Sequence, residues 1–257
     1  RGVLVVDQLT RETFEVYGRA VLLCASTLES TRLLLLSGLG QTGNALGHYL
    51  VDHIWGVRVS GFFRDSPGPP FEWEGTRANG IYIPRWQNLD QRTHPRFLRG
   101  YGYQGGAQRG HFPTHAYDLP GLGRSFKEAV KKDWPTPVWL SGFGEMLPRY
   151  ENYVEINPRV TDAWGIPVLN IVCAHGENER AITRDMIAGS MEMLHEAGVE
   201  INSVAFAAAE PGLGIHETGT ARMGNDAKKS VLNRYNLVHD APNVLVTDGA
   251  CYVSQGT

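Results

Sequence analysis

The sequence predicts a mixed α/β fold, in which a doubly wound domain is interrupted by an inserted, largely antiparallel sheet. Three observations lead to this prediction. An apolar strand runs into a helix near the start of the chain, alternating strands fill the middle, and an apolar strand ending in Asp-Gly returns near residue 248. We therefore expect residues 1–54 and 212–257 to form one domain and residues 55–211 to form the insertion.

The first 54 residues contain the strand-to-helix unit. Residues 3–6 and 14–17 are short β-rich runs that predict a hairpin, and residues 20–25 predict a buried strand. Ser26 and Glu29 fit a capping box at the start of the following helix, and Gly38 is expected to end that helix. A strand that enters a helix in this way is typical of nucleotide-binding sheets.

The middle of the chain has strands of period-two alternation at residues 57–62, 80–83 and 138–143, which predicts a sheet with one covered face. An amphipathic helix is expected at about residues 177–197, because apolar residues recur there at helical spacing before Gly198. Both elements belong to the expected insertion.

Residues 99–106 combine glycine with tyrosine and are interpreted as an aromatic, glycine-rich loop. Aromatic faces and amides suit the C–H faces and hydroxyls of carbohydrates, so Tyr101, Tyr103 and Gln104 could line a sugar site. The alternative is that they simply pack a long surface loop.

Residues 242–250 predict a second apolar strand of the doubly wound domain. It ends at Asp248, Gly249 and Ala250. Ligands bind beyond the carboxyl ends of strands in open α/β sheets, so these three residues are expected at a ligand site. The alternative for Asp248 is a turn that its own side chain closes.

The composition excludes several classes of protein. With 42% hydrophobic and 20% charged residues the chain should fold, and a net charge of −3 gives no basic excess for nucleic acid. No apolar run approaches the ~20 residues of a transmembrane helix. The cysteines, Cys24, Cys173 and Cys251, lack paired spacing, so they are interpreted as core thiols and no metal site is predicted. An exported, oxidising environment is not excluded.

The most informative segment reads GIHETGTARMGND and covers residues 214–226. Together with the strand end at Asp248 it resembles the C-terminal signature of the glucose-methanol-choline (GMC) family of flavin oxidoreductases. Residues 25–35 and 47–53 are similar to two further landmarks of that family. Four landmarks in the right order, spread over nearly the whole chain, are more specific than a lone glycine motif.

The resemblance implies an FAD-binding Rossmann-like domain, incomplete here, with an inserted substrate domain. It implies that His216 is the catalytic histidine. The expected cofactor-binding residues are Asp248, Gly249, Ala250, Ser26, Asp52 and His53. Taken by itself, His53 suits a structural role better than that of a second base, and Asp52 could orient it or cap a turn.

A histidine suits the reaction that the family carries out. Oxidising an alcohol requires removal of the hydroxyl proton as hydride leaves carbon for flavin N5. A neutral imidazole, whose unperturbed pKa is ~6.5, can accept that proton near neutral pH. The small residues after His216 would let the backbone pass close to the flavin ring.

Residues 79–85 and 97–103 look like those of bacterial GMC members that act on glycosides at C3, such as glucoside 3-dehydrogenases. The resemblance therefore implies oxidation of a sugar or glycoside hydroxyl to a ketone, with oxygen, a cytochrome or a small subunit as electron acceptor. A gluconate 2-dehydrogenase-like activity is the first alternative. A non-catalytic carbohydrate-binding or assembly subunit is the second, if the natural chain is this short. A bacterial periplasmic location is favoured over a cytoplasmic one.

Parts of the family pattern are missing from the sequence. The Gly-x-Gly-x-x-Gly turn that cradles the flavin diphosphate is not found, since residues 38–43 have the spacing but follow a helix. The family's second catalytic residue, Asn or His, would fall beyond Thr257. We therefore expect a piece of a longer protein, without the N-terminal half of its FAD domain, that alone neither holds FAD nor turns over.

Overall fold

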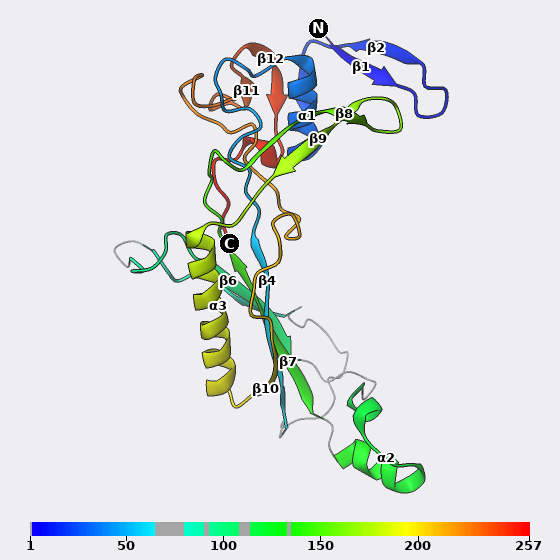
Figure 1. Ribbon diagram of the computed structural model, residues 1–257, viewed down its shortest axis with the longest axis vertical. Coiled ribbons are helices and arrows are strands. Elements are labelled where there is room, and N and C mark those ends of the chain that lie inside the picture. The colour runs from blue at the N-terminus through cyan, green and yellow to red at the C-terminus, as the bar shows by residue number, and fades with distance from the viewer. Residues whose placement is uncertain (1, 65–79, 90–92, 108–113, 133–134) are drawn as a thin grey trace. The chain divides into compact units, whose positions relative to one another are not determined.

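The computed structural model describes residues 2–64, 80–89, 93–107, 114–132 and 135–257 (Figure 1). Residue 79, the first of the segment 79–85 compared above with glycoside-oxidising enzymes, lies outside the described residues. Contacts divide the chain into two units. Unit 1 comprises Arg1–His53, Glu145–Gly176 and Glu210–Gly256, and unit 2 comprises Ile54–Gly144 and Glu177–Ala209.

Unit 1 begins with the predicted hairpin. Strands β1 (Gly2–Val6) and β2 (Thr13–Tyr17) pair in antiparallel register from Gly2↔Tyr17 to Val6↔Thr13. Asp7 Oδ1 accepts hydrogen bonds from the backbone N–H groups of Leu9 and Thr10, which closes the turn. The hairpin is therefore held by a local Asx turn as well as by its ladder.

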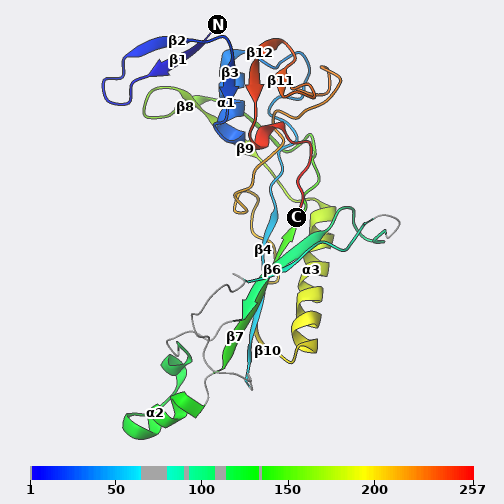
Figure 2. The same ribbon diagram turned by 180° about the vertical axis from the view of Figure 1, so that it is seen from behind.

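The core of unit 1 is a three-stranded sheet in the order β11-β12-β3, with helix α1 (Thr27–Ser37) (Figure 2). The strands are β3 (Val21–Leu23), β11 (Leu237–Val238) and β12 (Ala241–Val246). Strand β3 pairs in parallel with β12, so the carboxyl ends of both strands meet at one edge. Helix α1 packs against the apolar core of this sheet through Leu34, which is 1% exposed.

The two ends of α1 differ in how well the sequence predicts them. Gly38 adopts the left-handed conformation (φ 65°), and its N–H points at the carbonyls of Leu34 and Leu35, as expected for a helix C-terminus. The predicted capping box is wrong, because Ser26 has φ 75° and its side chain makes no capping hydrogen bond. The carboxylate of Glu29 instead pairs with Arg32 at 3.1 Å.

Residues 145–176 belong to unit 1, whereas the sequence placed them in the insertion at 55–211. Their strands β8 (Tyr153–Thr161) and β9 (Pro167–Val172) form an antiparallel hairpin. The guanidinium of Arg32 on α1 binds its turn, donating to the Pro167 and Ile166 carbonyls and to the Asp162 carboxylate at 2.7–3.0 Å. This hydrogen bonding by Arg32 lowers the pKa of Asp162. The alternation of residues along a strand predicts a hairpin, but it does not show to which of the two units the hairpin belongs.

Unit 2 is a five-stranded antiparallel sheet in the order β10-β4-β7-β6-β5. The strands are β4 (Ile54–Phe63), β5 (Ile81–Ile83), β6 (Tyr101–Ala107), β7 (Thr136–Gly144) and β10 (Glu200–Val204). Between β6 and β7 lie a 3-10 turn (Thr114–Asp118) and helix α2 (Gly123–Lys132). The mixed α/β class predicted for the chain, with an antiparallel sheet in its middle, is confirmed.

Helix α3 (Glu177–Glu196) covers one face of this sheet. It buries Ile182, Met186, Ile187 and Leu194, the stripe that the helical spacing predicted. Gly198 follows it with φ 77°. Among the described residues no helix is long and apolar enough to cross a membrane.

The segment predicted as an aromatic loop at 99–106 is instead strand β6, paired with both β5 and β7. Tyr101 and Tyr103 face α3 at 1% and 0% exposure, and their hydroxyls donate to the Asp185 carboxylate (2.7 Å) and the Met186 carbonyl (2.6 Å). Burial raises the pKa of Tyr103 to about 12, and burial also raises the pKa of Tyr101. The prediction that these two tyrosines contact substrate is therefore wrong, because both serve as the polar-tipped core of unit 2.

Two adjacent glycines of β6 should respond differently to a methyl group. A Cβ at Gly105 would lie 2.5 Å from the Trp139 carbonyl oxygen, whereas a Cβ at Gly106 would lie 3.5 Å from the Trp139 ring. We expect Gly105→Ala to lower the free energy of unfolding of the intact protein by ~1–3 kcal/mol, since backbone must shift. Urea unfolding monitored by circular dichroism measures the change.

Gly106→Ala is the matched control, on the same strand and with room for the methyl group. Its unfolding midpoint should stay close to the original, or rise slightly because alanine restricts the unfolded chain. Equal destabilisation by the two substitutions would contradict the close approach at Gly105.

Candidate functional site

Three backbone segments of unit 1 meet at the predicted site. Val51 and Thr218 form an antiparallel bridge, with the Val51 N–H 3.1 Å from the Thr218 carbonyl and the reverse bond at 2.9 Å. On the other side the N–H groups of Gly219 and Ala221 donate to the carbonyls of Gly249 and Ala250. The segment after His216 therefore lies between residues 47–53 and the strand end at Asp248, which the sequence predicted only as separate landmarks.

Asp248 closes a short 3-10 turn (Gly249–Cys251) directly after β12. Its Oδ1 accepts from the Ala250 N–H at 3.0 Å, and its Oδ2 accepts a hydrogen bond from the Ser30 hydroxyl. The strand-end turn that was the alternative for Asp248 is thus present. Contact of Asp248, Gly249 and Ala250 with a cofactor stays a prediction.

Three hydroxyl residues of α1 form hydrogen bonds with the segment after His216 and with the Asp248 turn. The sequence analysis did not predict these contacts. Thr27 donates to the Glu217 carbonyl, Ser30 donates to Asp248, and the hydroxyls of Thr31 and Thr220 lie 2.6 Å apart. All three side chains are at most 4% exposed. Their spacing of three and four residues, which places them on one helix face, was the available signal. Ser26, predicted to bind cofactor, lies at the start of the same helix.

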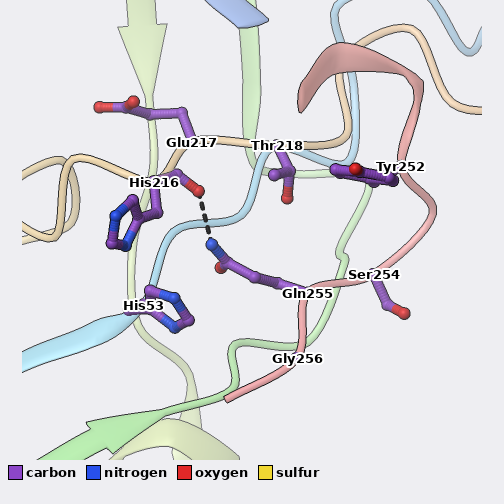
Figure 3. A pocket seen from close by; sticks show the side chains of 8 residues that line it. All are labelled: His53, His216, Glu217, Thr218, Tyr252, Ser254, Gln255 and Gly256. Atoms are coloured by element: carbon purple, nitrogen blue, oxygen red, sulfur yellow. Dashed lines mark hydrogen bonds between the residues drawn. The ribbon is translucent and has the colours of Figure 1, made fainter. Parts of the chain in front are cut away.

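His53 and His216 lie together beside a pocket of about 560 Å³ (Figure 3). Their ring centroids are 5.1 Å apart and the rings are nearly perpendicular at 87°. We call this space the histidine pocket; it is lined by His53, His216, Glu217, Thr218, Tyr252, Ser254, Gln255 and Gly256. The amide of Gln255 donates to the His216 carbonyl at 2.6 Å.

Two buried polar atoms at the histidine pocket, Thr218 Oγ1 and Gln255 Oε1, have no hydrogen-bond partner within the part of the chain that the structure describes. An unsatisfied buried polar atom costs ~1–3 kcal/mol, so such atoms are rare unless a ligand completes them. The volume also falls in the usual range for small-molecule sites, roughly 300–1,000 Å³. The pocket therefore has the size and the unpaired polar atoms to take a ligand that carries hydrogen-bonding groups, as a flavin ring does.

Asp52 is 1% exposed and does not line the histidine pocket, although the sequence reading grouped it with the cofactor residues. Its carboxylate faces the backbone of residues 212–216. In unit 2, Gln104 lies on the face of β6 opposite the two buried tyrosines and lines a hollow with Tyr82 and Trp139. Of the three residues predicted to contact sugar, only Gln104 is exposed.

The described residues contain no group of three His, Cys, Asp or Glu side chains that could hold a metal ion. Cys251 is buried, and burial raises the pKa of its thiol. Cys24 is exposed, with its sulfur 3.0 Å from the Thr247 hydroxyl, so the prediction that it is a core thiol is wrong.

Comparison with known proteins identifies relatives of the chain. Residues 148–257 match the family model described as GMC oxidoreductase. Over 99% of its length the chain is 28% identical to 2-methyl-1,2-propanediol dehydrogenase of Mycolicibacterium austroafricanum and 26% identical to the gluconate 2-dehydrogenase flavoprotein of Pantoea cypripedii. Over 96% it is 23% identical to the fructose dehydrogenase large subunit of Gluconobacter japonicus.

Solved structures agree at the level of fold. The chain aligns over its whole length with formate oxidase (TM-score 0.53, 14% identity, 54% of that chain) and with pyridoxine 4-oxidase from Mesorbium loti (TM-score 0.50, 16% identity, 50% of that chain). It spans only 43–47% of the three curated relatives. The predicted resemblance to GMC oxidoreductases is confirmed.

Ser30→Ala should weaken the hydrogen-bonded contact between α1 and the Asp248 turn. The Ser30 hydroxyl donates to Asp248 and accepts from the Ala25 N–H, so its removal leaves two polar groups without this partner. We expect the free energy of unfolding to fall by ~1–3 kcal/mol. The exposed Ser37 on the same helix provides the control, since Ser37→Ala should change it by less than ~0.5 kcal/mol. Indistinguishable midpoints of urea unfolding for the two variants would contradict a stabilising contact between Ser30 and Asp248.

Proposed function

We propose that the intact protein oxidises a CH–OH group of a sugar or related alcohol with FAD. The match of residues 148–257 to the GMC oxidoreductase family model supports this proposal. One observation carries the proposal. His216 and His53 line a pocket of ligand size in which Thr218 and Gln255 retain free hydrogen-bonding capacity.

The names of the relatives support the reaction class. All three are dehydrogenases, of a diol, of gluconate and of fructose, and one is named a flavoprotein. One is named a large subunit, which favours transfer of electrons to a partner subunit or cytochrome over transfer to oxygen. The electron acceptor of this protein is proposed on that basis.

Three residues of the histidine pocket, His216, Thr218 and Gln255, have a proposed task. Bound FAD would supply the acceptor for the hydride that leaves the substrate carbon. His216 accepts the proton of the substrate hydroxyl, which raises the rate by placing a base at the reacting atom. Gln255 fixes the His216 carbonyl, and the free oxygen atoms of Thr218 and Gln255 bind the polar edge of the flavin or the substrate.

The substrate is proposed more narrowly as a sugar or glycoside with a secondary hydroxyl, at C3. The resemblance of residues 79–85 and 97–103 to glycoside-oxidising members supports this choice. A sugar acid oxidised at C2 is the second candidate, favoured by the 26% identity to the gluconate 2-dehydrogenase flavoprotein. A non-catalytic subunit is disfavoured because the histidine pocket is present.

Anaerobic mixing of the flavin-loaded intact protein with methyl glucoside or gluconate distinguishes the two substrates. Bleaching of the oxidised flavin absorbance by the glucoside alone, with a 3-keto product, supports the first candidate. Bleaching by gluconate alone supports the second, and no bleaching by any sugar or diol tested would contradict the proposed function.

His216→Ala should lower kcat/KM for the substrate that bleaches the flavin by roughly 10²- to 10⁴-fold, the usual value of a positioned base. His195→Ala is the control, because this histidine is exposed on α3. We expect the control to turn over at the original rate. A fully active His216→Ala variant would show that His216 is not the catalytic base.

A further inference from the structure

We propose that Asp52 is a positioning residue that sets the placement of both imidazoles of the histidine pocket. The effect of Asp52 on turnover rests on the proposed function, whereas its effect on the placement of the two imidazoles does not. Asp52 lies immediately before His53 and faces the loop that carries His216, here called the 212–216 loop.

The carboxylate of Asp52 accepts four backbone hydrogen bonds. Its Oδ2 accepts from the N–H groups of Gly212 and Gly214, each at 2.9 Å. Its Oδ1 accepts from the N–H groups of His53 at 2.7 Å and His216 at 3.1 Å. One oxygen atom therefore binds the backbone of both histidines, and the other binds the loop leading to His216.

The loop is built to surround an anion. Alternate N–H groups of the 212–216 loop converge on one point, a concave arrangement of backbone donors that binds negative charge. No cationic side chain among the described residues forms an ion pair with Asp52. A buried charge is costly unless it is hydrogen-bonded, so these four bonds are what keep a 1% exposed carboxylate at this position.

The backbone conformation of the 212–216 loop is an independent reason to assign Asp52 a positioning role. Ile215 has φ 55°, a left-handed conformation that costs a β-branched residue ~1–3 kcal/mol. Its side chain is 75% exposed, so core packing does not impose this conformation. The residues on either side, Gly214 and His216, both donate to Asp52, and these hydrogen bonds offset the strain.

Glycine at 214 provides the space for this contact. A Cβ there would lie 2.6 Å from Oδ1 and 2.9 Å from Oδ2 of Asp52. A side chain at 214 would therefore push against the carboxylate. Gly214→Ala perturbs the same contact without removing the charge.

The test replaces Asp52 by asparagine in the intact, flavin-loaded protein. An amide has only one acceptor oxygen, so its NH₂ group must face two N–H donors, either those of the loop or those of the two histidines. We expect kcat to fall roughly 10- to 100-fold, as for a catalytic group displaced by about 1 Å, with KM changed by less than about threefold.

A second measurement does not depend on activity. Imidazole nitrogen resonances of ¹⁵N-histidine-labelled protein are assigned with His53→Gln and His216→Ala variants. Asp52→Asn and Gly214→Ala should each shift the resonances of His53 and His216. The resonance of His195, exposed on α3, should stay in place.

Asp240→Asn is the matched control, because Asp240 also accepts backbone N–H bonds with both oxygens, from Gly40 and Gln41. It should leave kcat and both histidine resonances unchanged. Unmoved His53 and His216 resonances in Asp52→Asn, or its unchanged kcat in an active enzyme, would overturn the proposal. If the original protein oxidises no alcohol, the proposed function fails, and the resonances alone decide the role of Asp52.

Discussion

The candidate site depends on the hydrogen bonds made by the buried hydroxyl groups on one face of α1. Thr27, Ser30 and Thr31 bind the segment after His216 and the turn at Asp248, which lie roughly 190 to 220 residues further along the chain. The parallel pairing of β3 with β12 brings those segments to the helix. Hydrogen bonds made by these hydroxyls, to the Glu217 carbonyl, the Asp248 carboxylate and the Thr220 hydroxyl, are directional, so they fix the orientation of the His216 segment more sharply than apolar packing would.

Local patterns predicted the elements whose formation depends on their own residues. The amphipathic stripe of α3, the hairpin at β1 and β2, and the left-handed Gly38 all follow from spacing and residue type. The capping box failed because tertiary hydrogen bonds hold the first turn of α1. Strand β6 was mistaken for a loop because Gly102 and Gly105 provide close approach to neighbouring backbone rather than a turn.

The sequence located much of the candidate site, but not the reason for its geometry. His216, His53 and Asp248 were singled out, and all three lie in unit 1 near the same backbone junction. The free oxygens of Thr218 and Gln255 could not be predicted, because unused hydrogen-bonding capacity appears only when every neighbour is placed. Asp52 was assigned to the cofactor, since a carboxylate that binds four backbone N–H groups carries no sequence signature.

The order of segments in unit 1 has a consequence for biosynthesis. The unit combines residues from the beginning, the middle and the end of the chain. When α1 and β3 leave the ribosome, the strand and the apolar residues that cover them, such as Val246, have not been translated. Contacts so distant in sequence form slowly and leave apolar surface open to aggregation. Until residues 241–251 have emerged from the ribosome, the nascent chain should therefore expose apolar surface to which chaperones can bind.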